Sequence, residues 1–285
     1  MERPNDQKID PDRISLKRKA KKLEEIIVSL KKVVIAYSGG VDSTLLLSMS
    51  QEILEDQVLA ITASSEIIPR KEIEEAKELA KKIGVRHQII FPEPMKNSDF
   101  VANTPERCYY CKYQLCARLN KIAEKEGAFF VADGTNQDDT GDYRPGKKAA
   151  SEWGMRSPLL EADLSKDDIR VLSKIRNLPT WNRPSNACLA SRIPYGREIT
   201  VDRLRRVEQA EEIITGLGAR QIRVRLHDDN TARIEVDPEG IDRLLGSETR
   251  SYIVNKLQDL GFIYITVDLK GYQAGSVNEL LKEAK

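Results

Sequence analysis

A chain of 285 residues is longer than one hydrophobic core usually serves, so its length favours two domains. Its 46 basic and 45 acidic residues leave a formal charge of +1, which predicts no general attraction to nucleic acid and favours a small-molecule substrate. Only four cysteines are present, the first residues lack the apolar stretch of a secretory signal, and no apolar run approaches the roughly 18 residues of a membrane span. We therefore expect a cytoplasmic protein without membrane contact.

The first two thirds of the chain alternate short apolar runs with charged, helix-forming stretches. An amphipathic helix with a solvated basic face is predicted over 14–32, before this alternation begins. The alternation predicts an α/β fold with an open, doubly wound parallel sheet. The strands are expected at 33–37, 57–63, 87–91 and 128–133, and the helices near 42–54, 70–83, 105–126 and 167–176.

A segment rich in Pro, Ser and Asn, at about 182–198, separates this pattern from a different one. We take it as a linker between a domain at 1–184 and a smaller α+β domain at 185–285. The second domain is expected to contain a helix capped by Thr200 that runs through about 215, strands within 220–226, 231–236 and 262–269, and helices across 239–260.

The sharpest motif is SGGVDS at residues 38–43, which follows a predicted buried strand and opens a helix. Its glycines allow a tight turn and a close backbone approach, and the helix N-terminus attracts an anion. An acidic residue there would repel a bare phosphate, so the motif predicts a divalent cation, Mg²⁺, shared with the phosphates. An ordinary capped turn is the alternative. The expected binding residues are Ala36, Ser38, Gly39, Gly40, Asp42 and Ser43, the last two with catalytic roles.

A second phosphate-loop pattern, GDYRPGKK at 141–148, does not meet the requirements of a Walker loop. Lys148 stands where Ser or Thr should hold Mg²⁺, and no apolar strand precedes the segment. We predict a mobile basic loop that closes over the site.

Two further segments, 61–66 and 132–139, should meet the SGG turn, because ligands bind beyond the carboxyl ends of strands where the strand order reverses. A helix-capping role is the alternative for the second segment, and it is compatible with ligand binding. The candidates are Thr62, Gly134 and Thr135 for the nucleotide, and Asp139 or Asp138 for the metal.

The SGG-x-DS loop resembles that of the PP-loop ATP pyrophosphatases, the adenine nucleotide alpha hydrolase-like enzymes. Segments 156–196, 223–236 and 271–280 are similar to the LarE family of sulfur transferases within that superfamily. The resemblance implies that ATP is split to AMP and pyrophosphate to activate a carboxylate as its adenylate. It implies sulfur insertion into pyridinium-3,5-biscarboxylic acid mononucleotide, for the nickel-pincer cofactor of lactate racemase. We also expect a homo-oligomer, with sulfide or another sulfur donor as partner.

The cysteines allow two sulfur sources. Cys108 and Cys111 lie three positions apart, so on a helix both thiols point to one side, whereas Cys116 is about 12 Å along the helix from Cys108 and is expected to be buried and inert. Cys188 can approach from the linker. The resemblance to three-cysteine LarE members implies a [4Fe-4S] cluster on Cys108, Cys111 and Cys188, while single-cysteine members sacrifice the sulfur of the residue matching Cys188. The alternatives to a cluster are zinc bound by the cysteines, or free thiols, of which Cys108 and Cys111 could form a redox pair.

The mononucleotide phosphate needs its own anion site. Arg223 and Arg225 alternate on a predicted strand, so both side chains leave one face and can bind a phosphate together. A solvated strand face is the alternative. Further candidates are Ser191 and Arg192 for this anion, and Glu211, Glu212 and Asp237 for a metal, among which spacing does not choose.

Two other functions fit parts of this pattern. A PP-loop tRNA thiolase would use the same ATP chemistry, but it should show a basic surface or an added RNA-binding domain, and neither is evident. A non-catalytic module that binds ATP or a cluster for a maturation complex is the second. Pyrophosphate release that depends on a substrate carboxylate would exclude such a module.

Overall fold

The computed structural model of the chain describes residues 11–141, 145–219 and 221–273. The chain divides into two compact units. The second unit includes two segments from the first half of the chain, so a single boundary in the sequence does not separate the units. The predicted boundary between residues 184 and 185 stays a prediction. The first unit contains the chain up to Ala63, Lys71–Phe91 and Lys112–Arg183, and the second contains Ser64–Arg70, Pro92–Cys111 and the chain from Pro184.

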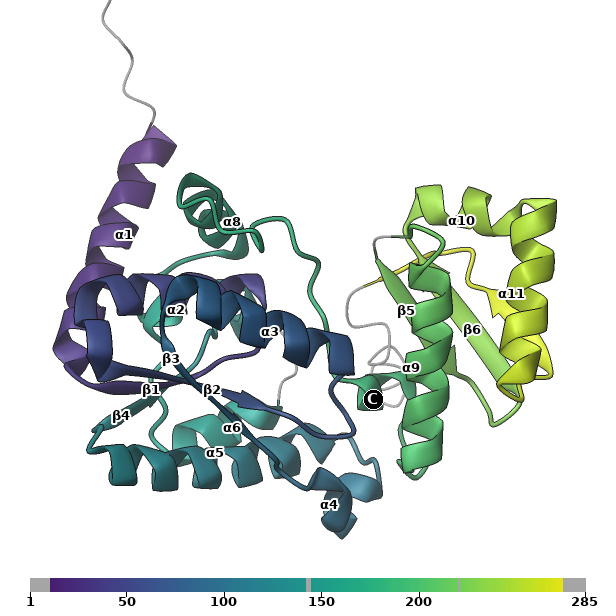
Figure 1. The fold of residues 1–285 in the computed structure, drawn as a ribbon, viewed down its shortest axis with the longest axis horizontal. Helices are drawn as coiled ribbons and strands as arrows, with labels where there is room; N and C mark the ends of the chain where they lie inside the picture. The colour runs from purple at the N-terminus through teal and green to yellow at the C-terminus, as the bar shows by residue number, and fades with distance from the viewer. Residues whose placement is uncertain (1–10, 142–144, 220, 274–285) are drawn as a thin grey trace, which may run out of the picture. The chain divides into compact units, whose positions relative to one another are not determined.

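The first unit is built on a four-stranded sheet in which all described pairings are parallel, in the order β3-β2-β1-β4. The predicted α/β class and all four strand positions are confirmed (Figure 1). The direction of winding reverses between β1 and β4, so their carboxyl ends flank the expected ligand edge. The strands are β1 (Val33–Ala36), β2 (Val58–Ala63), β3 (Arg86–Ile90) and β4 (Phe130–Ala132).

Helices cover both faces of this sheet (Figure 1). Because side chains alternate along a strand, Val33 and Ile35 join one core with α1, α2 and α8, whereas Val34 joins a second core with Leu119 and Ala123 of α5. Both faces of the inner strands β1 and β2 are therefore buried, as their continuous apolar runs predict, whereas the edge strand β3 has exposed residues. The helices are α1 (Pro11–Leu30), α2 (Val41–Leu54), α3 (Arg70–Ile83), α5 (Arg107–Glu126) and α8 (Lys166–Ile175).

The prediction of a loop over 141–148 is wrong for its second half, because α6 (Pro145–Glu152) is a helix. Proline suits the first helical turn, where its missing N–H would have no partner anyway. Residues 142–144 lie outside the described residues. The remaining short elements of the two units are η1 (Glu55–Gln57), η2 (Pro94–Lys96), α4 (Ser98–Val101), η3 (Gln137–Gly141), α7 (Pro158–Glu161) and η4 (Leu189–Arg192).

The second unit contains a three-stranded sheet of order β5-β6-β7, in which β5 and β6 are antiparallel and β6 and β7 are parallel. As predicted, Thr200 caps α9, accepting a hydrogen bond from the Arg203 N–H at 3.2 Å. No helix in the described ranges is long and apolar enough to cross a membrane. The elements are α9 (Val201–Thr215), β5 (Ile222–Leu226), β6 (Thr231–Val236), α10 (Pro238–Leu245), α11 (Ser247–Asp259) and β7 (Tyr264–Val267).

Candidate functional site

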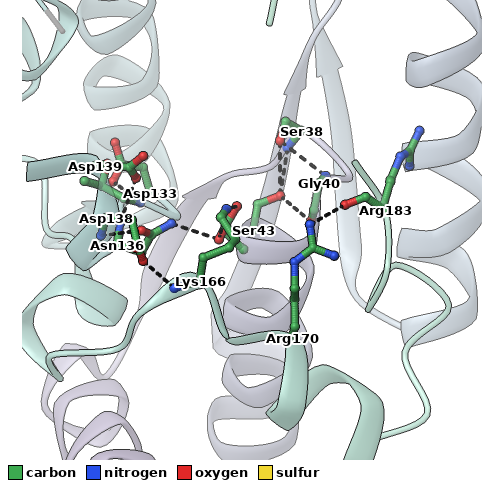
Figure 2. Close-up of polar contacts among 12 residues, drawn as sticks. Ser38, Gly40, Ser43, Asp133, Asn136, Asp138, Asp139, Lys166, Arg170 and Arg183 are labelled. Carbon is green, nitrogen blue, oxygen red and sulfur yellow. Dashed lines mark hydrogen bonds and ion pairs between the residues drawn. The ribbon is translucent and has the colours of Figure 1, made fainter. Parts of the chain in front are cut away.

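The SGG turn joins β1 to α2 and has the geometry that its sequence predicts. Gly39 has a φ of +74°, and an added Cβ would lie 3.0 Å from the Cβ of Ala76, so both backbone conformation and packing require glycine. The hydroxyls of Ser38 and Ser43 lie 3.2 Å apart, and the Gly40 N–H points to Ser38 Oγ at 3.4 Å (Figure 2). Backbone N–H groups and two hydroxyls therefore surround the start of a helix, an arrangement that binds anions.

The loop after β4 meets this turn directly, as predicted. A Cβ added to Gly134 would lie 2.9 Å from the backbone nitrogen of Ser43 and 3.1 Å from the Cβ of Asp42. Only glycine allows this approach without a backbone shift. Thr135 extends the loop, and its carbonyl accepts the Leu160 N–H at 3.1 Å, which ties the loop to α7.

A polar network connects the same loop to Asp42. The Asn136 side chain donates from Nδ2 to Asp42 at 3.0 Å, and the Asn136 backbone N–H donates to Asp139 at 2.9 Å. Lys166, the first residue of α8, places its ammonium 2.6 Å from Asp42 Oδ1 (Figure 2). Its backbone N–H donates to Asp138. Three carboxylates, one amide and one ammonium thus lie at the carboxyl edge of the sheet.

The donor set around Asp42 fits Mg²⁺ that is shared with a phosphate chain. Mg²⁺ in such sites takes one or two carboxylates and completes its shell with phosphate oxygens and water. Asp42 already attracts one cation, the Lys166 ammonium, and Asp139 is linked to it through Asn136. Within the described residues, no group of three or more His, Cys, Asp or Glu side chains is arranged to hold a metal. A metal here would therefore depend on its phosphate ligand.

Asp133, immediately before this loop, is a buried carboxylate that was not predicted. It pairs with Lys112 of α5 at 3.0 Å and accepts hydrogen bonds from Ser157 Oγ at 2.9 Å and from the Thr135 N–H at 3.1 Å. Burial raises the pKa of Asp133, but the charge of Lys112 and these hydrogen bonds outweigh burial, so the pKa lies below its ordinary value. The ionised carboxylate fixes the start of the loop.

Arg183 binds the SGG turn from the other side. Its guanidinium donates to the Gly39 carbonyl at 3.1 Å and pairs with Glu75 of α3. Arg170 of α8 donates to the Arg183 carbonyl at 3.1 Å and so holds this segment in place (Figure 2). The turn is therefore fixed by contacts with α3 and α8.

Thr62, at the end of β2, is fully engaged within the fold. Its hydroxyl donates to the Tyr37 carbonyl at 2.8 Å, so its one proton is used and His87 Nε2, also at 2.8 Å, must donate to it. His87 therefore carries its proton on Nε2. Burial lowers the pKa of His87, with Lys77 acting in the same direction, which keeps the ring neutral. The Thr62 side chain thus links β2 to Tyr37, the residue before the SGG turn. Binding of the nucleotide by Thr62 stays a prediction.

The Cys188 loop in the second unit is held by a buried arginine. Arg192, 2% exposed, donates to both carboxylate oxygens of Glu211 at 2.8 Å, and its remaining nitrogen donates to the carbonyls of Ala187 and Cys188 and to Ser191 Oγ. Glu211 also accepts the Val224 N–H. The metal-binding role considered for Glu211 has no support in this arrangement, because its oxygens serve Arg192 and the β5 backbone.

The two arginines of β5 differ in their surroundings, although both are buried. Arg225 pairs with Glu235 and donates to the Ser191 carbonyl at 2.9 Å. Arg223 donates to two carbonyls, those of Ile222 and Ser185, and no carboxylate of the described chain lies within ion-pair distance. Burial, and then the nearby charge of Arg192, lowers the pKa of Arg223. A cation without a carboxylate partner is the better anion ligand, so Arg223 is better suited than Arg225 to bind a phosphate.

Comparison with known proteins covers both units. Residues 16–126 match the model of the NAD synthase family. The pyridinium-3,5-bisthiocarboxylic acid mononucleotide synthase of Lactiplantibacillus plantarum is 39% identical over 272 residues, which are 95% of this chain and 98% of that protein. The chain belongs to the LarE family. Uncharacterized proteins of Synechocystis sp. and Methanocaldococcus jannaschii are also similar, at 42% over 93% of the chain and 33% over 86%.

The cysteines of this LarE-family chain separate into two groups. Cys108, Cys111 and Cys188 all belong to the second unit, and Cys111 and Cys188 pack against the same hydrophobic core. Cys116 belongs to the first unit and is buried, as predicted, with its Sγ 3.1 Å from Met155 Sδ. Burial raises the pKa of the Cys116 thiol, with smaller contributions from nearby charges. The three cysteines implied by the LarE resemblance are thus brought into one unit.

Several residues of the LarE-family site were missed from the sequence. Lys166 was one, although Ser165 and Asp168 form a capping box that marks the helix start where it lies. Arg183 and Asn136 carry no such mark, because their partners at Gly39 and Asp42 are distant in sequence. Asp237, considered as a metal ligand, caps α10 instead. Glu212 makes no described contact that indicates a metal.

Proposed function

We propose that the chain is an ATP-dependent sulfurtransferase that converts the carboxylates of pyridinium-3,5-biscarboxylic acid mononucleotide to thiocarboxylates. The observation that carries the proposal is the match to the synthase over 95% of the chain, which includes both the SGG turn and the Cys188 loop. The product would serve the nickel-pincer cofactor, as the LarE resemblance implies. We also propose a cytoplasmic homo-oligomer.

The first unit would activate the carboxylate. A substrate oxygen attacks the α-phosphorus of ATP, the bond to the β-phosphate breaks, and pyrophosphate leaves with both electrons of that bond. The Gly40 N–H, the hydroxyls of Ser38 and Ser43 and the Lys166 ammonium would neutralise the departing charge. Asp42 and Asp139 would hold Mg²⁺, which supplies Lewis-acid stabilisation of the phosphate oxygens. Arg183 and Gly134 support this geometry from either side of the turn.

The acyl adenylate then accepts sulfur, and we propose Cys188 as the residue that delivers it or helps to hold its source. In the sacrificial route the Cys188 thiolate attacks the acyl carbon and expels AMP. Loss of the Cα proton then breaks the Cβ–Sγ bond, which leaves dehydroalanine at position 188 and releases the thiocarboxylate. This route consumes one protein chain per sulfur atom.

In the catalytic route, which we favour, Cys108, Cys111 and Cys188 hold a [4Fe-4S] cluster. Thiolates are the ligands of such clusters, and all three cysteines belong to one unit, but in the described structure their side chains are not arranged as a metal site. Cys108 is exposed and the other two are half-buried, so a cluster would lie at the edge of the core. When bound, the cluster supplies an iron that lacks a protein ligand and can carry sulfide.

We assign the phosphate of the mononucleotide to Arg223. Its guanidinium lacks a carboxylate partner among the described residues, whereas Arg225 and Arg192 are neutralised by Glu235 and Glu211. Ser191 is the remaining candidate for binding this phosphate. Its carbonyl already accepts a hydrogen bond from Arg225, and its hydroxyl accepts one from Arg192. Arg223 therefore brings the substrate to the unit that contains Cys188.

The test measures pyrophosphate release and the mass of Cys188 in the same reaction. Release that requires the dicarboxylate mononucleotide supports adenylation of that substrate, and release without it contradicts the proposal. An intact Cys188 after several turnovers supports the catalytic route, while loss of one H₂S per chain supports the sacrificial route. Sulfur found in tRNA instead would identify the thiolase alternative.

A further inference from the structure

Asn103 is a fully buried polar residue that binds the turn following the Cys188 loop. Its φ is +54°, a backbone conformation that asparagine tolerates better than most residues. Its side-chain Nδ2 donates to the carbonyls of Pro194 at 2.8 Å and Arg197 at 2.7 Å, and its own carbonyl accepts the Gly196 N–H at 3.0 Å. One side chain and one carbonyl thus satisfy three backbone groups of this turn.

Arg107 completes the contact from the first turn of α5. It is 2% exposed, its Nη1 donates to Asn103 Oδ1 and reaches the Ile193 carbonyl at 3.5 Å, and its guanidinium lies over the Tyr195 ring at 4.4 Å. Within the described chain no carboxylate lies within ion-pair distance of Arg107, and its buried Nε has no hydrogen-bond partner.

A buried cation with an unpaired donor is costly for a fold. Lysine would avoid the cost at Nε, but it could not both stack on Tyr195 and donate sideways to Asn103, because it lacks a planar guanidinium. The turn at 193–197 therefore requires a planar guanidinium that stacks on Tyr195 and donates to Asn103 at the same time.

The position of Arg107 shows what that geometry controls. Arg107 precedes Cys108 and lies one helical turn before Cys111. The turn that it binds begins at Ile193, directly after the 3₁₀ helix whose N-cap is Cys188. Arg192 fixes the other side of that helix through the carbonyls of Ala187 and Cys188.

We infer that Asn103 and Arg107 are positioning residues that hold the Cys188 loop in register with Cys108 and Cys111. We call this pair the latch. The inference rests on the proposed function for its purpose, sulfur transfer by these cysteines acting together. Its structural content, that the latch sets the distance between the thiols, can be tested without any cluster.

The experiment compares Arg107→Lys with Arg206→Lys in the full-length chain. Arg206 is a matched control in the same unit, because its guanidinium lies over Phe262 at 4.4 Å and donates to the carbonyls of Leu260, Asp229 and Gly261. Apo protein is treated with a bimane reagent that fluoresces only after it joins two thiols, and peptide mass identifies the joined cysteines. Iron per chain after anaerobic reconstitution and the melting temperature are measured on the same samples.

The latch predicts that joining of Cys188 to Cys108 or Cys111 slows by about fivefold or more in Arg107→Lys, the change expected when a hydrogen-bonded arrangement is lost. Iron content should fall with it. Arg206→Lys should lower the melting temperature by a similar amount but leave joining and iron content at wild-type values.

Three results would overturn the latch: wild-type protein in which the thiols cannot be joined, equal losses in both variants, or an Arg107→Lys protein that only melts earlier. A loss of joining in Arg107→Lys alone, with no iron bound by any variant, would support the latch and contradict the cluster.

Discussion

Gly134 packs so closely against the start of α2 that a side chain at this position would clash with it. An added Cβ would lie 2.9 Å from the Ser43 nitrogen, so Gly134→Ala must displace backbone at the proposed phosphate site. We expect KM for ATP to rise by about tenfold or more, because small displacements of positioning groups have large effects. Gly216→Ala is the control, since its added Cβ would meet nothing closer than 3.4 Å. Unchanged ATP kinetics in folded Gly134→Ala protein would contradict this reading of the site.

The buried pair of Lys112 and Asp133 gives a prediction about pH. In Lys112→Met the carboxylate keeps its burial but loses its cation, so we expect a loss of about 3–5 kcal/mol in the free energy of unfolding at pH 7. The pKa of Asp133, lowered in the wild type, should rise in the variant. A raised pKa means that the folded state takes up a proton more readily, so the deficit should narrow as pH falls from 7 toward about 4.

Denaturant unfolding across that pH range measures this deficit. The double variant Lys112→Met with Asp133→Asn should recover part of the stability at pH 7, because no buried charge remains. A deficit that stays constant from pH 7 to pH 4 would show that the carboxylate is not the source of the loss.

At the scale of single residues, contacts between neighbours in the chain were predictable, and contacts between distant residues were not. The SGG turn was predictable because its glycines, hydroxyls and helix start are adjacent in the chain. Lys166 was not, because its ammonium reaches Asp42 from 124 positions away, and only the folded sheet edge brings them together. The different surroundings of Arg223 and Arg225 were not predictable either, since the pairing of Arg225 with Glu235 depends on the strand register.

Among the secondary-structure elements, α8 has the most direct influence on the site, because it presents Lys166 and Arg170. Its start is fixed by a capping box, in which the Ser165 hydroxyl accepts the Asp168 N–H at 3.2 Å and Asp168 accepts the Ser165 N–H at 3.0 Å. Ser165→Ala should cost about 1 kcal/mol of stability and also slow pyrophosphate release. Thr200→Ala removes the cap of α9 at similar cost, and it should leave that release unchanged. Equal kinetics in the two variants would contradict the role given to α8.

Most elements were predictable because their patterns are local. The apolar runs identified all four strands of the first sheet, and Thr200 identified the start of α9. The error at 145–148 arose because this segment was interpreted as an incomplete phosphate loop, whereas Pro145 begins α6. Strand order was expected only in general form, because the pairing of β1 with both β2 and β4 depends on contacts between distant residues.

The division of the whole molecule into two units differs most from what the chain order alone implies. Residues 64–70 and 92–111 join the C-terminal half, tied by bonds such as Leu189 N–H to the Ile67 carbonyl at 2.8 Å and Ile199 N–H to the Val101 carbonyl at 2.9 Å. No local pattern predicts such pairings. These pairings place the Cys108 segment in the same unit as Cys188.

That grouping leads to a prediction for the four cysteines. Cys108→Ala, Cys111→Ala and Cys188→Ala should each lose bound iron after anaerobic reconstitution, because each removes one of three proposed ligands. Cys116→Ala should keep it, since this thiol is buried in the other unit beside Met155. Iron and sulfide analysis with visible absorption measures the outcome. Loss of the cluster in Cys116→Ala would show that the ligand set is wrong.

We propose that ATP cleavage by this chain activates a carboxylate for sulfur transfer. The most direct measurement is the mass of the mononucleotide product, taken together with the AMP formed in the same reaction. We predict that each carboxylate exchanges one oxygen for one sulfur, with one AMP released per exchange. AMP formation with a mononucleotide that contains no sulfur would contradict the account.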